Sequence, residues 1–321
     1  MKFGDVVRAT AVLETFNGIG PLIRPTAKCG WPLKSSLDEV PDTVTILRDG
    51  LVVKEREKVS NLNVEMIADL MMGEKTARSV RSDHTRYDAP VLLQAKGVGV
   101  YPVAEDGIDF QLQPGEIVAL AGPVGGGKEA LAMMLAGQLT PYKGKISGSG
   151  GTLPTIGLVP TDRHASGYVG ILGVRENVAI GGLDLLSGKL GFIDRKKEAA
   201  HIGGLARQIN VISSSLEQAV SQLSGGNQQK VVFARALCHN PQVVVALSPT
   251  RGVDVGAKEQ LYALLRDLAS KGLGVVVVSD EEDEIAQLAN RVVIVFEGKL
   301  VAELRGDYTM KDLILRMEGV I

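Results

Sequence analysis

The residues with the clearest chemical potential form a glycine-rich stretch, GPVGGGK at 122–128, which follows the apolar run at 116–121. Glycines allow successive backbone N–H groups to turn inward around phosphate oxygens, and a lysine neutralises those oxygens. The apolar residues after this stretch recur on one face of a helix, and the N-terminus of a helix favours an anion. The candidate phosphate-binding residues are Gly122, Gly125, Gly126, Gly127, Lys128 and Glu129.

Glu129 departs from the usual form of such a loop. A serine or threonine normally follows the lysine and gives its hydroxyl to Mg²⁺. A carboxylate can bind Mg²⁺, but it also repels phosphate oxygens. The loop alone therefore leaves open a strand-to-helix turn that binds nothing, and a second motif is needed to favour nucleotide binding.

The second motif is LSGGNQQK at 223–230, within the stretch VSQLSGGNQQKVVFARAL. It resembles the signature of ABC ATPases, in the form found in monosaccharide importers of the ribose, galactose and xylose type. The segments PTRGVDVGAKEQLYALLRDLASKG (249–272) and VPTDRHASGYVGILGVRENVAI (159–180) are similar to the same group. The resemblance covers residues of about 35–75 and 91–321.

The resemblance implies a shared active site. Each ATP would lie between the phosphate loop of one cassette and the signature of the opposite cassette, in a homodimer or a heterodimer. Membrane permease subunits would be further partners, contacted near residues 167–177. Tyr101 lies where such cassettes stack an aromatic ring on adenine, and a plain packing role is an equal alternative. The residues presented to the partner would be Ser224, Gly225, Gly226 and Gln228, with Asp254 in the D-loop.

Several positions that such cassettes use for hydrolysis are altered. Alignment on Pro249 and Thr250 places Leu247 at the metal-binding aspartate and Ser248 at the water-polarising glutamate, while Asp280 occupies the switch-histidine position. Because general-base assistance alone is worth on the order of 10²–10⁴ in rate, we expect weak or absent hydrolysis at this site. ATP is the expected cofactor, Mg²⁺ binding is in doubt, and no catalytic or resident metal-binding residue is assigned.

An internal repeat predicts the domain organisation. DTVTILRDGLVVKE (42–55) matches NRVVIVFEGKLVAE (290–303), and each copy reads as a β-hairpin. A short amphipathic helix is expected after each hairpin, at 63–73 and 309–319. We therefore predict the remnant of a first cassette, a polar linker and one complete cassette, with the N-terminal residues unassigned. The boundaries are 1–34, 35–75, 76–90 and 91–321.

Composition indicates an ordinary globular protein. The chain has 321 residues, a formal net charge of −2 and 45% hydrophobic residues, so no basic excess points to a nucleic-acid partner. Two cysteines, Cys29 and Cys238, favour a reducing compartment. The longest apolar runs are too short to span a membrane. We expect a cytoplasmic protein, peripheral at the inner face of the cell membrane.

The expected fold is α/β, with a RecA-like P-loop ABC ATPase core, an antiparallel β flap at about 91–114 and an inserted helical subdomain at 165–220. The acidic run DEEDEI (280–285) is interpreted as a solvated helix start. The expected function is the ATP-binding subunit of a sugar importer that completes the site of a partner cassette. Two alternatives stay open: a non-catalytic regulatory module that binds nucleotide, and a truncated remnant of a tandem ATPase.

Overall fold

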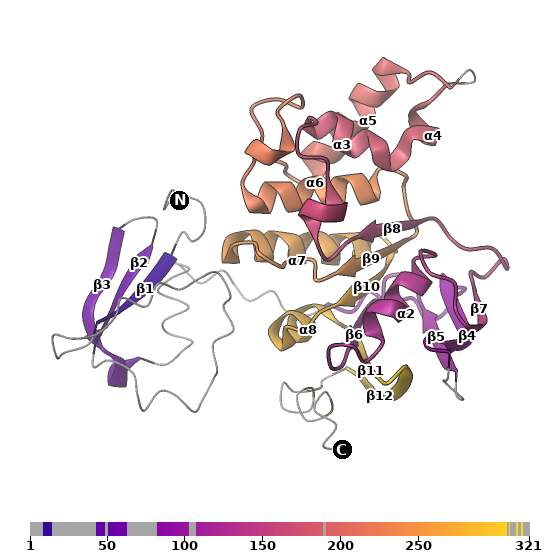
Figure 1. Ribbon diagram of the computed structural model, residues 1–321, viewed down its shortest axis with the longest axis horizontal. Helices are drawn as coiled ribbons and strands as arrows, with labels where there is room; N and C mark the ends of the chain where they lie inside the picture. The colour runs from indigo at the N-terminus through magenta and orange to yellow at the C-terminus, as the bar shows by residue number, and fades with distance from the viewer. Residues whose placement is uncertain are drawn as a thin grey trace. The chain divides into compact units, whose positions relative to one another are not determined.

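The computed structural model describes residues 9–14, 43–48, 51–62, 82–102, 107–188 and 191–306, with residues 308, 313 and 316. The chain divides into two compact units, residues 1–79 with residues 254–257, and residues 80–253 with residues 258–321 (Figure 1). The predicted helix at 63–73 lies outside the described residues, as does most of the one at 309–319.

The first unit contains a small antiparallel sheet of three strands. They are β1 (Ala9–Glu14), β2 (Thr43–Arg48) and β3 (Leu51–Lys58), in that order, and a 3-10 turn, η2 (Val59–Asn61), follows. In β2, Val44 and Ile46 are buried and Thr45 between them is less so, which is the alternation of a strand with one covered face. β1 lies within residues 1–34, for which the sequence patterns predicted no element.

The second unit is built on a six-stranded sheet with the order β12-β11-β6-β10-β9-β8. Neighbouring strands are parallel except β11 and β12, which form an antiparallel hairpin. β6, β9 and β10 are buried along their whole length, as expected for parallel strands that are covered on both faces. The bounds are β6 (Ile117–Ala121), β8 (Ile156–Val159), β9 (Val243–Leu247), β10 (Gly274–Val278), β11 (Arg291–Phe296) and β12 (Lys299–Arg305).

Helices cover this sheet on both faces. On one face α2 (Lys128–Leu135) shares a buried apolar cluster with alternate residues of the central strands. On the other face α6 (Gly225–Leu237) and α7 (Val255–Ser270) pack against the intervening residues, and α8 (Glu282–Leu288) packs near β11. This arrangement confirms the predicted RecA-like core (Figure 1).

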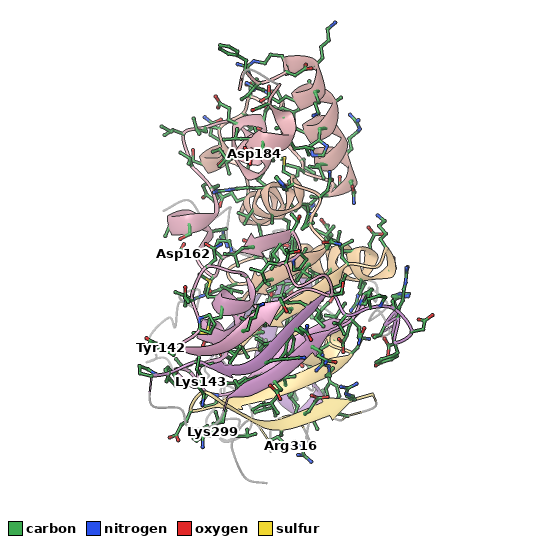
Figure 2. The ribbon with its side chains drawn as sticks, turned by 90° about the vertical axis from the view of Figure 1, so that its right-hand side faces the viewer. Tyr142, Lys143, Asp162, Asp184, Lys299 and Arg316 are labelled. Atoms are coloured by element: carbon green, nitrogen blue, oxygen red, sulfur yellow. The ribbon has the colours of Figure 1, made fainter. Side chains whose placement is uncertain are left out.

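The predicted flap is a second antiparallel sheet with the order β5-β4-β7. β4 (Leu93–Gly99) and β5 (Ile108–Leu112) lie inside the expected range, whereas β7 (Lys143–Ser147) comes from beyond the phosphate helix α2. Tyr142 and Lys143 mark the start of β7 in Figure 2. The flap packs its apolar side on the same cluster as α2, so it helps to fix the phosphate loop from behind.

A helical subdomain lies between β8 and α6, as the sequence predicted. Asp162 caps its first turn and Asp184 lies within it (Figure 2). Among the described residues, no helix of the protein is long and apolar enough to cross a membrane. The elements are η3 (Arg163–Gly167), α3 (Val174–Ala179), η4 (Ile180–Gly182), α4 (Leu183–Leu186), α5 (Arg195–Gln208) and η5 (Val220–Gln222).

Both predicted hairpins are present. β11 begins 248 residues after β2 (291 against 43), which is the offset of the repeat. Their surroundings differ, because β2 pairs with β1 in an antiparallel sheet while β11 pairs with β6 in the core. Part of the predicted linker belongs to the second unit, since the Arg86 N–H donates to the Pro114 carbonyl at 2.9 Å.

Candidate functional site

The candidate site lies where three neighbouring strands end. β10 lies between β6 and β9, and Val278 is in register with both Leu120 and Leu247. Because the strands are parallel, the segments that follow them emerge at the same edge of the sheet. The phosphate loop after β6 therefore lies beside Asp280, which follows β10.

The phosphate loop has the backbone of an anion cradle. Gly122, Gly125 and Gly127 have φ of 134°, 79° and 107°, values that L side chains rarely adopt. At Gly122 a Cβ would also lie 2.1 Å from the Val295 carbonyl oxygen. The loop is held by hydrogen bonds from the Gly126 N–H to the Pro123 carbonyl at 3.0 Å and from the Gly298 N–H to the Gly126 carbonyl at 2.8 Å.

Lys128 begins α2, and its side chain is fully buried. Its Nζ donates to the carbonyl oxygens of Gly122 at 2.8 Å and Pro123 at 3.2 Å. The same atom lies 2.8 Å from Asp280 Oδ1 and 3.2 Å from Glu129 Oε1. An ammonium group has three N–H donors, so four protein oxygens already satisfy the group that was expected to face phosphate.

The end of β9 holds no carboxylate. Leu247 is buried in the cluster that contains Leu131 and Leu135 of α2. Ser248 follows with φ of 46°, and its N–H donates to the Val278 carbonyl at 2.7 Å. The position that was aligned with a metal-binding aspartate is therefore part of the hydrophobic core.

These residues do not fit an ordinary Mg²⁺ site. Mg²⁺ prefers oxygen ligands in near-octahedral geometry, and Leu247 offers none. The two carboxylates at this edge, Glu129 and Asp280, both lie against the Lys128 amine. The backbone cradle fits a phosphate group better than the side chains fit a metal ion.

Glu284 is a buried carboxyl that sequence reasoning missed. It is 1% exposed and accepts a hydrogen bond from the Thr250 hydroxyl at 2.8 Å. Burial raises the pKa of this carboxyl, against the opposing effect of hydrogen bonds from Ser279 and Thr250. The acidic run was interpreted as solvated; for Glu284 this is corrected, because the residue begins the covered side of α8, which continues with Ile285 and Leu288.

Tyr101 lies against the phosphate loop. Its hydroxyl donates to the Gly125 carbonyl at 2.6 Å. A Cβ on Gly298 would lie 2.7 Å from Tyr101 Cδ2, so the ring packs directly over that glycine. The structure thus gives Tyr101 a packing contact and leaves adenine stacking as a prediction.

The signature residues stand at the N-terminal end of α6. Ser224 is the N-cap residue and is exposed. Its hydroxyl accepts a hydrogen bond from Asn227 Nδ2 at 3.0 Å, and Asn227 Oδ1 accepts one from the Ile212 N–H at 2.8 Å. Gly225 is partly exposed and Gly226 is buried, so of the two signature glycines it is Gly225 that reaches the surface.

Gln228 differs from the expectation that it faces a partner. Its side chain is buried and donates to the Leu223 carbonyl at 3.1 Å. Its Oε1 accepts from Arg163 Nε at 3.4 Å. Gln228 therefore holds the loop that precedes the signature, because one helical turn after Ser224 its side chain points back into the protein.

Arg163 is a second residue that sequence reasoning missed. Besides Gln228, its guanidinium donates to the carbonyls of Arg251 at 2.8 Å and Gly252 at 3.1 Å. It therefore ties the segment after β8 to the signature and to the loop after β9. Asp254 makes a different contact. Its Oδ1 accepts a hydrogen bond from the Ala257 N–H at 2.9 Å, at the start of α7.

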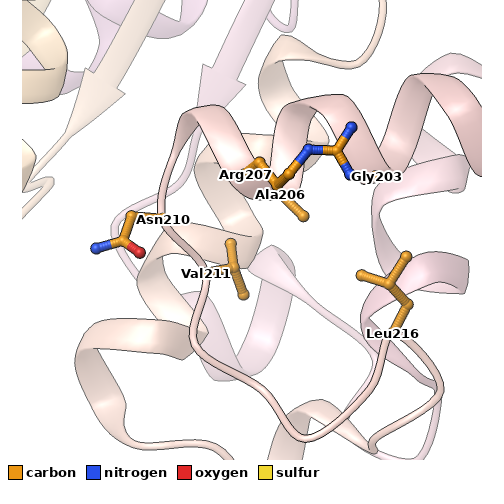
Figure 3. Close-up of a pocket in the computed structure, with 6 residues that line it drawn as sticks. All are labelled: Gly203, Ala206, Arg207, Asn210, Val211 and Leu216. Carbon is orange, nitrogen blue, oxygen red and sulfur yellow. The ribbon is translucent and has the colours of Figure 1, made fainter.

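A hollow of about 340 Å³ lies beside the C-terminal end of α5 (Figure 3). Arg207 is its single charged residue, and the Asn210 carbonyl accepts a hydrogen bond from Lys230 Nζ at 2.8 Å. It contains neither a carboxylate nor a glycine-lined cradle like that of the phosphate loop. We assign it no ligand. It is lined by Gly203, Ala206, Arg207, Asn210, Val211 and Leu216.

Known proteins resemble this chain in sequence and in fold. The ABC transporter family model matches residues 106–251. The ribose import ATP-binding protein RbsA of Hahella chejuensis is 33% identical over 292 residues, which is 87% of this chain and 57% of that protein. The xylose import ATP-binding protein XylG of Yersinia pseudotuberculosis is 31% identical over 289 residues, 84% of this chain and 56% of that protein.

Solved structures share the fold. A nucleotide-free ATP-binding cassette from an ABC transporter has a TM-score of 0.60 at 20% identity, with 70% of this chain and 95% of that one covered. The dimeric bacterial ABC transporter cassette MJ0796 has a TM-score of 0.58 at 22% identity, with 68% and 100% covered. The chain spans little more than half the length of the curated relatives that it matches. The solved structures share the fold, and the sequence matches show that this chain belongs to the family of ABC transporter ATP-binding proteins, among relatives of the sugar-import type.

Proposed function

We propose that this chain is the ATP-binding subunit of a sugar importer, and that it completes the active site of a partner cassette while turning over little or no ATP itself. The observation that carries the proposal is an asymmetry. Ser224 is exposed at the start of α6, while the phosphate edge has Leu247 where a cassette that hydrolyses ATP needs a carboxylate.

The phosphate loop supports nucleotide binding more than hydrolysis. Backbone N–H groups can wrap phosphate oxygens without any side chain, and the glycine conformations for this are present. Hydrolysis also needs a group that orients the attacking water. The Asp280 carboxylate is already paired with the Lys128 amine, and the Glu284 carboxyl is buried. We therefore expect ATP binding without a normal requirement for Mg²⁺.

The signature supports a partner cassette. Helix N-termini attract anions through their free N–H groups, and the exposed hydroxyl of Ser224 adds a donor that rotates freely enough to meet a phosphate. One solved neighbour, MJ0796, is described as a dimeric cassette. By analogy the partner would be a second cassette that presents its own nucleotide to Ser224.

A surface of the helical subdomain supports docking to a permease. Ile171 is 87% exposed, and Val169 beside it is also exposed. Their loop is fixed by the fully buried Asn177, whose Nδ2 donates to the carbonyls of Val169 at 3.0 Å and Leu172 at 3.1 Å. Contiguous exposed apolar side chains mark interaction sites, and we take Val169 and Ile171 as the centre of such a patch because permease contact is expected near residues 167–177. Such docking would hold the chain at the inner face of the membrane.

The proposal is tested by measuring ATP binding and turnover with the chain alone and with a cassette that carries both missing carboxylates. We expect binding without turnover for the chain alone, and faster turnover by the partner when the two are mixed. Turnover by the chain alone at the rate of an ordinary cassette, abolished by Lys128→Ala, would refute it.

Docking is tested separately by co-purification with the permease subunits of a sugar importer. Ile171→Glu is expected to abolish association, while Val301→Glu, a matched change at an exposed strand position, leaves it intact. If the Ile171→Glu variant still co-purified with the permease subunits, the exposed loop would have a role other than permease binding.

A further inference from the structure

The carboxylates around Lys128 form a lid over its amine. Lys128 is fully buried, whereas the side chains of Asp280 and Glu129 are 59% and 45% exposed. The amine has no exposed surface of its own, and the two acidic groups that contact it do. An anion that approaches from solvent encounters negative charge before it reaches the lysine.

Asp280 is placed there by the topology of the sheet. It follows β10, the strand between the one that feeds the phosphate loop and the one that ends at Leu247. Its Oδ1 is 2.8 Å from Lys128 Nζ, which is the distance of a direct charge-assisted hydrogen bond. In a phosphate loop of this kind backbone N–H groups hold the first and second phosphates, and the lysine reaches the second and third.

We propose that Asp280 is a specificity determinant that occupies the place of the terminal phosphate, so that the loop favours a nucleoside diphosphate over a triphosphate. This inference rests on the proposed function, because it takes the loop to be a nucleotide site. The backbone cradle still serves the two inner phosphates of either nucleotide. The third phosphate must in addition take the place beside Lys128 that the Asp280 carboxylate fills.

Glu129 contributes less to this selection. Its contact with Lys128 is longer, at 3.2 Å, and it stands at the start of α2, at the position whose usual hydroxyl binds the Mg²⁺ that bridges the second and third phosphates. Its charge therefore weakens the binding of both nucleotides. Replacing Glu129 changes both affinities together, whereas replacing Asp280 changes their ratio.

The test is a titration of the full chain with ATP and with ADP, each with Mg²⁺ and with EDTA. The wild type is expected to bind ADP about tenfold more tightly than ATP, because the third phosphate approaches the Asp280 carboxylate and like charges repel. Asp280→Asn should tighten ATP binding on the order of tenfold and leave the ADP affinity within about twofold. Glu129→Gln should tighten both equally.

Asp283→Asn is the matched control. Asp283 is exposed in the first turn of α8, three residues from Asp280, and loses the same charge. An unchanged ATP-to-ADP ratio in this variant shows that the effect of Asp280→Asn comes from the contact with Lys128. An equal shift in both variants would mean a general charge effect and would overturn the inference.

Two other results would overturn it while leaving nucleotide binding intact: a wild type that prefers ATP, or an Asp280→Asn variant with an unchanged ratio. If the wild type did turn over ATP and Asp280→Asn abolished that turnover, Asp280 would instead be a general base, and the inference would be overturned. If neither the wild type nor Asp280→Asn bound either nucleotide, the nucleotide-binding part of the proposed function would fall together with this inference.

Discussion

Two regions of the protein differ in the exposure of their polar groups. One is the sheet edge that carries the phosphate loop, and the other is the N-terminal end of α6. At the sheet edge Lys128 is buried under Asp280 and Glu129, and Leu247 closes the end of β9 with an apolar contact. At the helix end Ser224 is exposed. One region is satisfied within the chain and the other still has a group to offer, so the second is the better candidate for work on an outside ligand.

The two regions also differ in the residues that hold them in place. Lys128 is held by its own loop and by the end of the neighbouring strand. The signature is held from behind by Gln228 and Arg163, and Ser224 is exposed, with its hydroxyl accepting a hydrogen bond from the neighbouring Asn227. Rigid support behind an exposed donor is what a site that acts on a partner requires.

The largest effect is expected from placing a carboxylate at the end of β9, where the chain has Leu247. Leu247→Asp should lower the free energy of unfolding by about 4 kcal/mol, because it buries an unpaired charge in the core. The control Leu247→Met should cost less than about 1.5 kcal/mol. Urea denaturation measures both. A stable Leu247→Asp variant that gains ATP turnover would show that this edge is still built for hydrolysis.

The second prediction concerns Lys128. Lys128→Ala should weaken the binding of ATP and ADP on the order of 100-fold, because the loop loses its buried cation. Lys145→Ala, at an exposed position in β7, is the control for charge. Isothermal titration measures the affinities. Unchanged nucleotide affinity would place any binding site away from this loop.

The third prediction uses the buried carboxyl of Glu284. Its pKa is raised in the folded protein by burial, so between its unfolded and folded values the native state binds more protons. Its contribution to stability therefore falls as the pH rises through that window. Glu284→Gln should match the wild type in acid and become more stable than it towards neutral pH. Thermal unfolding from acid to neutral pH measures the difference, and a difference that does not vary with pH would contradict the assignment.

The smallest effect should come from Arg163. Arg163→Lys keeps the charge but loses the planar fork that reaches the carbonyls of Arg251 and Gly252. We expect the stimulation of a partner cassette to fall about fivefold, the equivalent of ~1 kcal/mol. Arg207→Lys on α5 is the matched control. Equal stimulation by both variants would remove Arg163 from the support of the signature.

Much of the fold follows from local sequence patterns. The apolar run before Gly122 predicts a buried strand, and the matching stretches at 42–55 and 290–303 predict two hairpins, all of which are present. These features depend on neighbouring residues alone. β1 was missed because it pairs with β2 more than 25 residues away and carries no turn signal that predicts the pairing.

The candidate site was less predictable, because its contacts depend on strand order. Lys128 and Asp280 are 152 residues apart (280 against 128) and meet only because β10 lies next to β6. Glu284 stands in an acidic run that looks solvated until α8 packs on the core. Gln228 belongs to a recognisable motif, but the letters of the motif do not say which way its side chain points.

The most direct test of the central claim is single-turnover ATP hydrolysis in a one-to-one mixture of this chain with a cassette that carries both missing carboxylates. Ser224→Arg in this chain should lower the rate on the order of 100-fold, as expected when a charge-stabilising donor is removed. Lys128→Ala should leave the rate within about twofold. A rate that collapses with Lys128→Ala and survives Ser224→Arg would contradict the account, because hydrolysis would then occur at this chain's own phosphate loop.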